Sequence, residues 1–259
     1  MQKENIINTG TDKRLLSIYY TAGYPTLDST LDIAEQLERS GVDFLEIGVP
    51  YSDPVADGPV IQRSSQTALE NGMTVQTLFD QLQELSTRVT IPVFLMGYFN
   101  PVLQFGVENF CKSCREVGVT GVIIPDLPLY EYEELYQETF MKYGISNVFL
   151  VTPQTSDERI RKIDNLSNSF IYLLSSNATT GKNLHVNNQA ELYFERLKSM
   201  KLKSPLVIGF GISDAKTFQK ATDYATGAII GTAFVNILGQ QNYQDKIEGF
   251  INNIIFPAP

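Results

Sequence analysis

The sequence has little of what metal centres and nucleic-acid surfaces require. It contains two cysteines, Cys111 and Cys114, and one histidine, His185, so the C-x-x-C pair lacks two further ligands for zinc. Lysines and arginines number 20 against 29 acidic residues, and the formal net charge of −9 disfavours nucleic acid and anionic membranes as partners. A phosphate ligand is not excluded, because backbone N–H groups and helix N-termini bind phosphate without basic side chains.

Long apolar runs are absent as well. No run approaches the roughly 20 apolar residues that span a bilayer, and the N-terminal MQKENIINTGTDKR lacks the apolar core of a signal peptide. We therefore expect a cytoplasmic protein. The segment FGVENFCKSCREVG has Val107, Phe110, Cys114 and Val117 at helical spacing, which favours a structural role for the cysteines over a redox role.

Eight short apolar runs alternate with polar amphipathic segments along the 259 residues. Several runs are apolar without alternation, as expected for parallel strands whose outer face is covered. This pattern predicts an α/β fold, a single-domain (β/α)₈ TIM barrel over residues 1–259. An open doubly wound sheet is the alternative, but TAGYPT follows the first run in place of G-x-G-x-x-G. The expected strands are Leu15–Tyr20, Phe44–Val49, Pro92–Met96, Gly121–Ile124, Asn147–Val151, Phe170–Leu174, Leu206–Gly209 and Gly227–Ile230.

Capping residues mark the ends of the helices expected between these strands. Thr155 and Glu158 have the spacing of a capping box, and Ser213 is placed to cap a helix. The glycines expected to end helices are Gly41, Gly118 and Gly144.

Two stretches that follow strands are extended. They are Val49–Met73 after the second run and Ser175–His185 after the sixth. In a barrel such loops lie at the carboxyl ends of the strands, where active sites are built.

Two carboxylates in the segment LEIGVPYSDPVADGP are candidates for acid–base chemistry. Glu46 lies within an apolar run, and its burial would raise its pKa toward the range useful for proton transfer. Asp57 is placed to face Glu46 across the mouth of a barrel. The alternative for Glu46 is an ion pair, and for Asp53 or Asp57 a turn or a helix cap before Pro59.

Glycine-bearing turns follow the last three expected strands. They are Thr180–Gly181, Gly209–Gly211 and Gly231–Thr232. Loops after strands 7 and 8, with a nearby helix N-terminus, form the phosphate cradle of many barrel enzymes. Tyr172, on the sixth expected strand, is either a core aromatic residue or a phenol that points into the barrel mouth.

Together these residues resemble one family, the α subunits of tryptophan synthase. The resemblance runs from about Leu15 to Leu238 and rests on TAGYP, LEIGVPYSDPVADGP, FLMGYFNP, IIPDLP, YLLS, TTG, GFGIS and IGTA in the family's order. It implies a retro-aldol lyase that cleaves indole-3-glycerol phosphate to indole and glyceraldehyde 3-phosphate. It also implies a chain without metal or cofactor that works in an α2β2 complex, with pyridoxal phosphate only in the β subunit.

The resemblance further implies residue roles. Glu46 resembles the catalytic acid/base, Asp57 the carboxylate that accepts the indole N–H, and Tyr172 the active-site tyrosine. Asp53 and Asp126 resemble residues of the surface that meets, and communicates with, the β subunit. The implied phosphate site comprises Gly181, Phe210, Gly211, Gly231 and Thr232. The implied indole pocket comprises Tyr19, Leu95 and Ile123, with Phe210 beside them.

Two features depart from the family's common pattern, and some alternatives stay open. Thr232 stands where many members have serine, and SSNATTGKN replaces a Gly-Val-Thr-Gly run after the sixth strand. A stand-alone lyase and a catalytically silent regulatory subunit are alternatives, and a sugar-phosphate isomerase is a more distant one.

Overall fold

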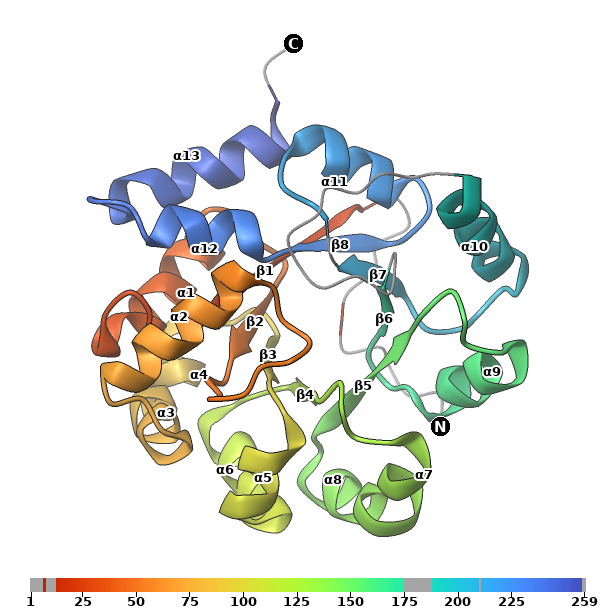
Figure 1. The fold of residues 1–259 in the computed structure, drawn as a ribbon, viewed down its shortest axis with the longest axis horizontal. Helices are drawn as coiled ribbons and strands as arrows, with labels where there is room; N and C mark the ends of the chain where they lie inside the picture. The colour runs from red at the N-terminus through yellow and green to blue at the C-terminus, as the bar shows by residue number, and fades with distance from the viewer. Residues whose placement is uncertain (1–6, 8–12, 175–187, 210, 258–259) are drawn as a thin grey trace.

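The computed structural model describes residue 7 and residues 13–174, 188–209 and 211–257. Eight parallel strands pair in chain order, and β1 closes the barrel by pairing with β8 (Figure 1). The predicted (β/α)₈ barrel is therefore confirmed. The strands are β1 Leu15–Thr21, β2 Phe44–Gly48, β3 Val93–Met96, β4 Gly121–Ile123, β5 Ser146–Val151, β6 Ile171–Leu174, β7 Leu206–Gly209 and β8 Gly227–Ile230.

Helices surround the barrel on its outside, as Figure 1 shows. All eight expected strands are present, and none of their ends is shifted by more than one residue. The helices are α1 Thr30–Arg39, α2 Pro59–Glu70, α3 Val75–Gln81, α4 Leu85–Arg88, α5 Phe99–Phe105, α6 Val107–Val117, α7 Leu129–Glu131, α8 Gln137–Tyr143, α9 Asp157–Leu166, α10 Asn188–Ser199, α11 Ala215–Thr222, α12 Thr232–Leu238 and α13 Gln244–Ile255. Three short turns of other helical type are η1 Leu27–Ser29, η2 Leu82–Glu84 and η3 Tyr132–Tyr136.

Side chains of each strand alternate between the barrel interior and the layer beneath the helices. On β2, Phe44 belongs to the interior cluster, whereas Leu45 and Ile47 belong to the outer one. Three phenylalanines meet inside the barrel, with ring centroids 5.2–6.0 Å apart: Phe44, Phe94 and Phe170. Two of these contacts are edge-to-face and the third is tilted, and such packing makes a rigid apolar floor. Phe44 lies two residues before Glu46 on β2, so the floor to which it belongs sits one layer below the Glu46 carboxyl.

The two predicted helix caps are each wrong by one residue. The N-cap of α9 is Ser156, whose hydroxyl accepts the Arg159 N–H at 3.3 Å, whereas the Thr155 hydroxyl accepts the N–H of Thr152. The N-cap of α11 is not Ser213 but the residue after it, Asp214, which forms a capping box with Thr217. The three glycines expected to end helices adopt positive φ as predicted; they are Gly41 at 94°, Gly118 at 86° and Gly144 at 69°.

The expected loop Val49–Met73 is shorter than predicted. Residues 59–70 of it form α2, which begins with Pro59 in the first helical position and Gly58 as N-cap. The irregular part after β2 is therefore residues 49–58. The extended stretch after β6 lies outside the described residues, as does His185.

Both cysteines are buried on α6 and are free thiols, so the structural interpretation is confirmed. Burial raises the pKa of the Cys111 thiol to about 12, which keeps it protonated and unreactive at neutral pH. Across the described residues, none of the helices has the length and apolarity needed to cross a membrane.

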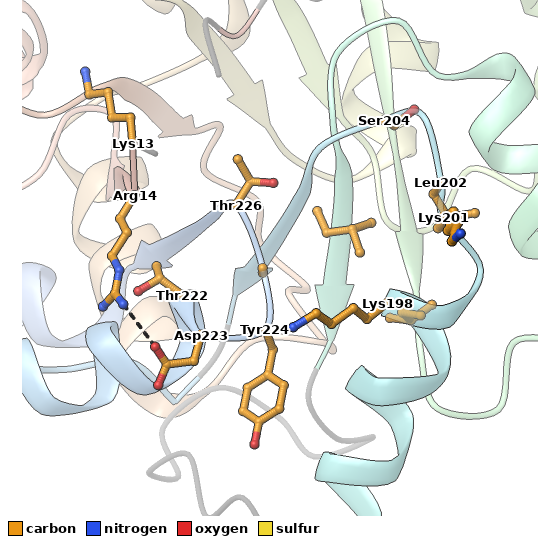
Figure 2. A pocket seen from close by; sticks show the side chains of 13 residues that line it. Lys13, Arg14, Lys198, Lys201, Leu202, Ser204, Thr222, Asp223, Tyr224 and Thr226 are labelled. Carbon is orange, nitrogen blue, oxygen red and sulfur yellow. Dashed lines mark hydrogen bonds and ion pairs between the residues drawn. The ribbon is translucent and has the colours of Figure 1, made fainter. Parts of the chain in front are cut away.

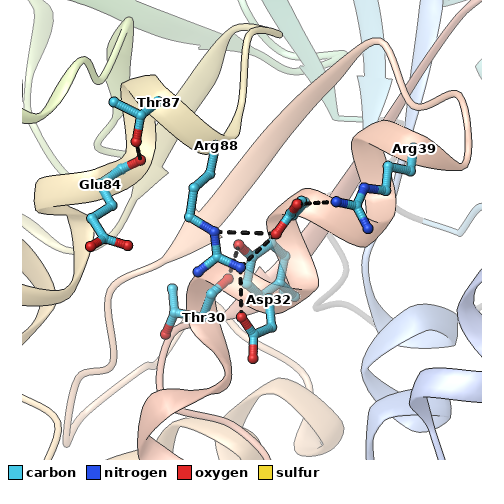
Figure 3. Close-up of polar contacts among 8 residues, drawn as sticks. Thr30, Asp32, Arg39, Glu84, Thr87 and Arg88 are labelled. Carbon is cyan, nitrogen blue, oxygen red and sulfur yellow. Dashed lines mark hydrogen bonds and ion pairs between the residues drawn. The ribbon is translucent and has the colours of Figure 1, made fainter.

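An ion-pair network holds α4 against α1 (Figure 3). The Arg88 guanidinium donates to Asp32 at 2.7 Å and to Glu35 at 2.6 Å, and Arg39 also contacts Glu35. Burial of Leu85 adds the apolar part of this contact. A four-residue helix is not stable by itself, so α4 depends on these tertiary contacts.

Candidate active site

Glu46 is the one acidic side chain on β2, and it is fully buried. It pairs in register with Tyr19 of β1 and Phe94 of β3, and it alternates with the outward-facing Leu45 and Ile47. Neither carboxyl oxygen has a hydrogen-bond partner among the described residues. Burial without compensation raises the pKa of Glu46 to about 8, so the carboxyl carries its proton at neutral pH. The ion pair considered as an alternative is absent from the described residues.

Asp57 lies at the end of the loop that follows β2 and is half-buried. The Tyr98 hydroxyl donates to its carboxylate at 3.1 Å and accepts the Ala56 N–H at 3.0 Å. Burial raises the pKa of Asp57 to about 6, and the bond from Tyr98 counters part of that rise. Asp57 does not cap α2, because Gly58 occupies that position. This carboxyl is thus mainly ionised at neutral pH, whereas Glu46 is not.

Two tyrosine hydroxyls extend over glycines of neighbouring strands. A β-carbon at Gly209 would lie 1.9 Å from the Tyr172 hydroxyl oxygen, and one at Gly48 would lie 2.2 Å from that of Tyr19. Only glycine leaves room for these phenols at the carboxyl ends of β7 and β2. Burial, followed by the charges of Glu46 and Asp57, raises the pKa of Tyr172 well above its usual range. Tyr172 therefore lies near both carboxyl groups, as part of the same cluster.

The predicted apolar pocket is only partly assembled as expected. Ile123 belongs to the interior cluster, and Tyr19 packs against that cluster. Leu95 does not lie there, because it packs in the outer layer beneath the helices. The prediction that Leu95 lines the pocket was therefore wrong. Its neighbour Met96 faces the interior and pairs in register with Gly48 of β2. Alternation from the inward Glu46, applied across the sheet register, would have selected Met96.

The glycine turns after β7 and β8 lie at adjacent strand ends. Gly211 has a φ of 78°, a left-handed conformation that glycine adopts without strain. Gly231 is the N-cap of α12, and Thr232 is the first residue of that helix. The Tyr19 ring lies 3.4 Å from where a β-carbon of Gly231 would be, so this turn borders the barrel mouth. Two other residues predicted for the phosphate site, Gly181 and Phe210, lie outside the described residues.

The two predicted partner-surface residues occupy different positions. Asp53 is exposed in the loop after β2, and the Ser52 hydroxyl donates to it at 2.5 Å. It borders a surface cavity of about 520 Å³ beside Val55, whose side chain is 81% exposed. Asp126 accepts the Phe99 N–H at 2.8 Å and so ties the loop after β4 to the start of α5.

Sequence reasoning missed Tyr98 as a functional residue. It lies within the FLMGYFNP motif, but its hydroxyl reaches Asp57 across 41 residues of sequence. Its ring packs on Tyr51 with centroids 5.2 Å apart, and that contact holds the phenol against the loop after β2.

A closed (β/α)₈ barrel with a protonated buried carboxyl and a second, ionised one at the strand ends defines a barrel enzyme of acid–base type. The family model for the tryptophan synthase alpha chain matches residues 8–256. The chain therefore belongs to the tryptophan synthase alpha chain family, which makes it a lyase of tryptophan biosynthesis.

Individual relatives agree over almost the whole chain. The tryptophan synthase alpha chain of Flavobacterium johnsoniae is 56% identical over 94% of this chain and 96% of its own length. That of Bacteroides thetaiotaomicron is 47% identical, with 95% and 96% covered. The crystal structure of the Legionella pneumophila alpha subunit superposes with a TM-score of 0.84 at 30% identity, with 93% and 91% covered. A chain of the Pyrococcus furiosus tryptophan synthase complex has a TM-score of 0.83 at 31% identity, with 93% and 97% covered.

Proposed function

We propose that this chain cleaves the carbon–carbon bond of indole-3-glycerol phosphate, releasing indole and glyceraldehyde 3-phosphate. The observation that carries the proposal is the buried Glu46 carboxyl, which has a pKa of about 8 and lies one layer above an apolar floor. A neutral carboxyl in such surroundings is a proton donor at neutral pH. A flat indole ring suits the apolar walls supplied by Tyr19, Ile123 and Met96.

Glu46 begins the reaction as the acid. Its proton passes to C3 of the indole ring, and the ring nitrogen then carries positive charge. The Glu46 carboxylate next accepts the proton of the glycerol hydroxyl beside the scissile bond. That bond breaks, its electron pair neutralises the ring, and the hydroxyl carbon becomes the aldehyde. Glu46 is protonated again at the end, so a single carboxyl serves both proton transfers.

Asp57 acts as an ionised carboxylate in the same reaction. Its pKa of about 6 leaves it charged at neutral pH, so it accepts the indole N–H and stabilises the positive ring nitrogen. Tyr172 lies close to both carboxyls and orients the substrate between them. Two neighbouring carboxyls with separated pKa values can take different roles at the same pH, one as proton donor and one as a fixed charge.

The substrate phosphate binds at the turns after β7 and β8 in this proposal. The amino-terminal N–H groups of α12, which begins at Thr232, have no partner within the helix and suit an anion. The left-handed Gly211 brings backbone close to the same strand ends. Both proton transfers of the reaction use the Glu46 carboxyl, so the proposal needs no cofactor or metal in this chain.

The chain works with a β subunit in an α2β2 complex, in which the β subunit carries pyridoxal phosphate. The exposed Asp53 and the adjacent Val55 lie on the loop that continues from Asp57 and offer a contact surface linked to the site. Asp126 connects to the same region through Phe99, the residue after Tyr98. The location of the chain in the cytoplasm stays a prediction from the sequence.

Indole release from indole-3-glycerol phosphate, measured with and without added β subunit, tests the proposal. We expect slow release by the chain alone and faster release with the β subunit. Equal release in both cases would instead identify a stand-alone lyase, and no release in either would identify a regulatory subunit. Glu46→Gln is expected to lower the rate by about 10²–10⁴-fold, whereas the exposed Glu158→Gln leaves it unchanged.

A further inference from the structure

A second cavity, of about 550 Å³, opens at the end of the barrel opposite the carboxyl cluster (Figure 2). Its walls come from segments that enter strands: Arg14 precedes β1, Leu206 begins β7 and Thr226 precedes β8. Leu197 and Lys198, near the end of α10, close another side. All eight strands run in the same direction, so this cavity and the site around Glu46 are separated by the length of the barrel.

The charge around this cavity is opposite to that of the chain. The chain has 20 basic and 29 acidic residues, yet four basic side chains and one acidic side chain line the cavity. The basic residues are Lys13, Arg14, Lys198 and Lys201, and the acidic one is Asp223. A local excess of positive charge in a concave surface concentrates anions.

Ion pairing leaves two of these four cations without a carboxylate. Arg14 pairs with Asp223 at 3.0 Å, and Lys13 pairs with Asp43, which does not line the cavity. Among the described residues, no carboxylate lies within ion-pair distance of Lys198 or Lys201. Figure 2 shows the Lys198 side chain extending across the cavity toward the turn at Asp223.

Acidic groups also lie on the outer side of this region. Glu191 and Glu195 of α10 are close enough to Tyr224 to help raise the pKa of its phenol, after burial as the main cause. Neither glutamate forms an ion pair with Lys198, although Glu195 is only one turn earlier on the same helix. Lys198 instead lines the cavity, and Figure 2 shows its side chain extending across it.

The cavity walls are fixed before any ligand binds. The Tyr224 ring stacks on Phe194, with centroids 5.4 Å apart and planes 30° apart. Lys201 has a φ of 48°, and its N–H donates to the Lys198 carbonyl at 3.4 Å. This hydrogen bond closes the turn that carries both lysines. Ser204 also lines the wall, and its relative exposure is only 7%.

We propose that this cavity is a second anion-binding site, which takes a small phosphorylated ligand. Lys198 and Arg14 bind the anion from opposite sides, and Lys201 contributes charge at the rim. A volume of about 550 Å³ is that of a small-molecule site, so the ligand is a metabolite-sized anion rather than a macromolecule. The site is independent of the lyase reaction, because it contains none of the residues proposed for catalysis.

Inorganic pyrophosphate is the probe for this site, followed by the backbone amide signals of the ¹⁵N-labelled full chain at low ionic strength. We expect shifts at Ser204 and Thr226 that saturate separately from any at Gly231 and Thr232, the proposed substrate phosphate site. Raising NaCl from about 20 to about 200 mM should weaken binding at the cavity, since exposed charges are screened. Shifts confined to Gly231 and Thr232 would overturn the proposal.

A matched pair of variants separates this site from general charge effects. Lys198→Ala with Lys201→Ala should weaken pyrophosphate binding about tenfold or more, because the two unpaired cations are removed. Lys216→Ala with Lys220→Ala removes the same charge from exposed positions of α11 and should change binding less than about twofold. Equal weakening in both variants would refute a specific site. Lys198→Gln replaces the first variant if that one does not fold, and is expected to weaken binding severalfold.

Discussion

Tyr98→Phe tests whether hydrogen bonding sets the ionisation of Asp57. The change removes one oxygen, which donates to the Asp57 carboxylate at 3.1 Å and accepts the Ala56 N–H at 3.0 Å. A hydrogen bond to a carboxylate favours its charged form, so losing the bond raises the pKa of Asp57 above its value of about 6. The contribution at a half-buried site is about 1 kcal/mol, which corresponds to a rise of about 0.7 pH unit.

This shift gives the variant a distinctive pH profile. At about pH 6 the ionised fraction of Asp57 should fall from about one half to about one sixth, a loss of about threefold in kcat/KM. Near pH 8 the fraction stays above about nine tenths in both proteins, so their rates should be almost equal. The assay is indole release from indole-3-glycerol phosphate in the presence of the β subunit, between about pH 5 and pH 8.

Tyr51→Phe is the matched control for this measurement. The Tyr51 ring packs on Tyr98, but its hydroxyl meets the Asn100 amide at 3.4 Å and not Asp57. The control should keep the profile of the unmodified chain. A Tyr98→Phe rate reduced equally at every pH would refute the reasoning, because the hydroxyl would then act through loop structure rather than through the pKa of Asp57.

Three further predictions concern other parts of the barrel. Activity should fall as pH rises through about 8, because Glu46 loses the proton that it donates, and a kcat/KM profile that stays flat to about pH 9 would contradict this. Gly209→Ala should lower the free energy of unfolding by about 1–3 kcal/mol in denaturant titrations, because its methyl group would collide with the Tyr172 hydroxyl. Arg88→Ala should lower the thermal midpoint by about 2–4 °C, because α4 loses its contacts with α1, and an unchanged midpoint would show that these ion pairs are not stabilising.

The barrel and its principal carboxyl were predictable because they depend on local pattern. Eight apolar runs that alternate with amphipathic segments correspond to the eight strands, since burial on both faces of a parallel strand leaves no polar alternation. Glu46 stands out against its apolar neighbours for the same reason. The helix caps at Ser156 and Asp214 were missed by one residue, because several adjacent hydroxyls or carboxylates compete for the same backbone N–H groups.

The inward direction of a side chain was harder to predict than its burial. Leu95 and Met96 are adjacent and both apolar, but only Met96 faces the barrel interior. Composition alone does not tell which of the two faces inward. The register between β2 and β3 decides the matter, since Met96 pairs with Gly48 on the face that also carries Glu46.

The sequence by itself determined that this chain forms a barrel, that Glu46 is buried in a strand, and that glycine turns follow β7 and β8. These features follow from hydrophobic period and turn chemistry, which act over a few residues. Only the tertiary structure decided that Tyr98 holds Asp57, that Gly209 makes room for Tyr172, and that Lys198 faces a cavity at the far end of the barrel. Each of those depends on residues far apart in sequence, whose separation is set by closure of the sheet rather than by local preference.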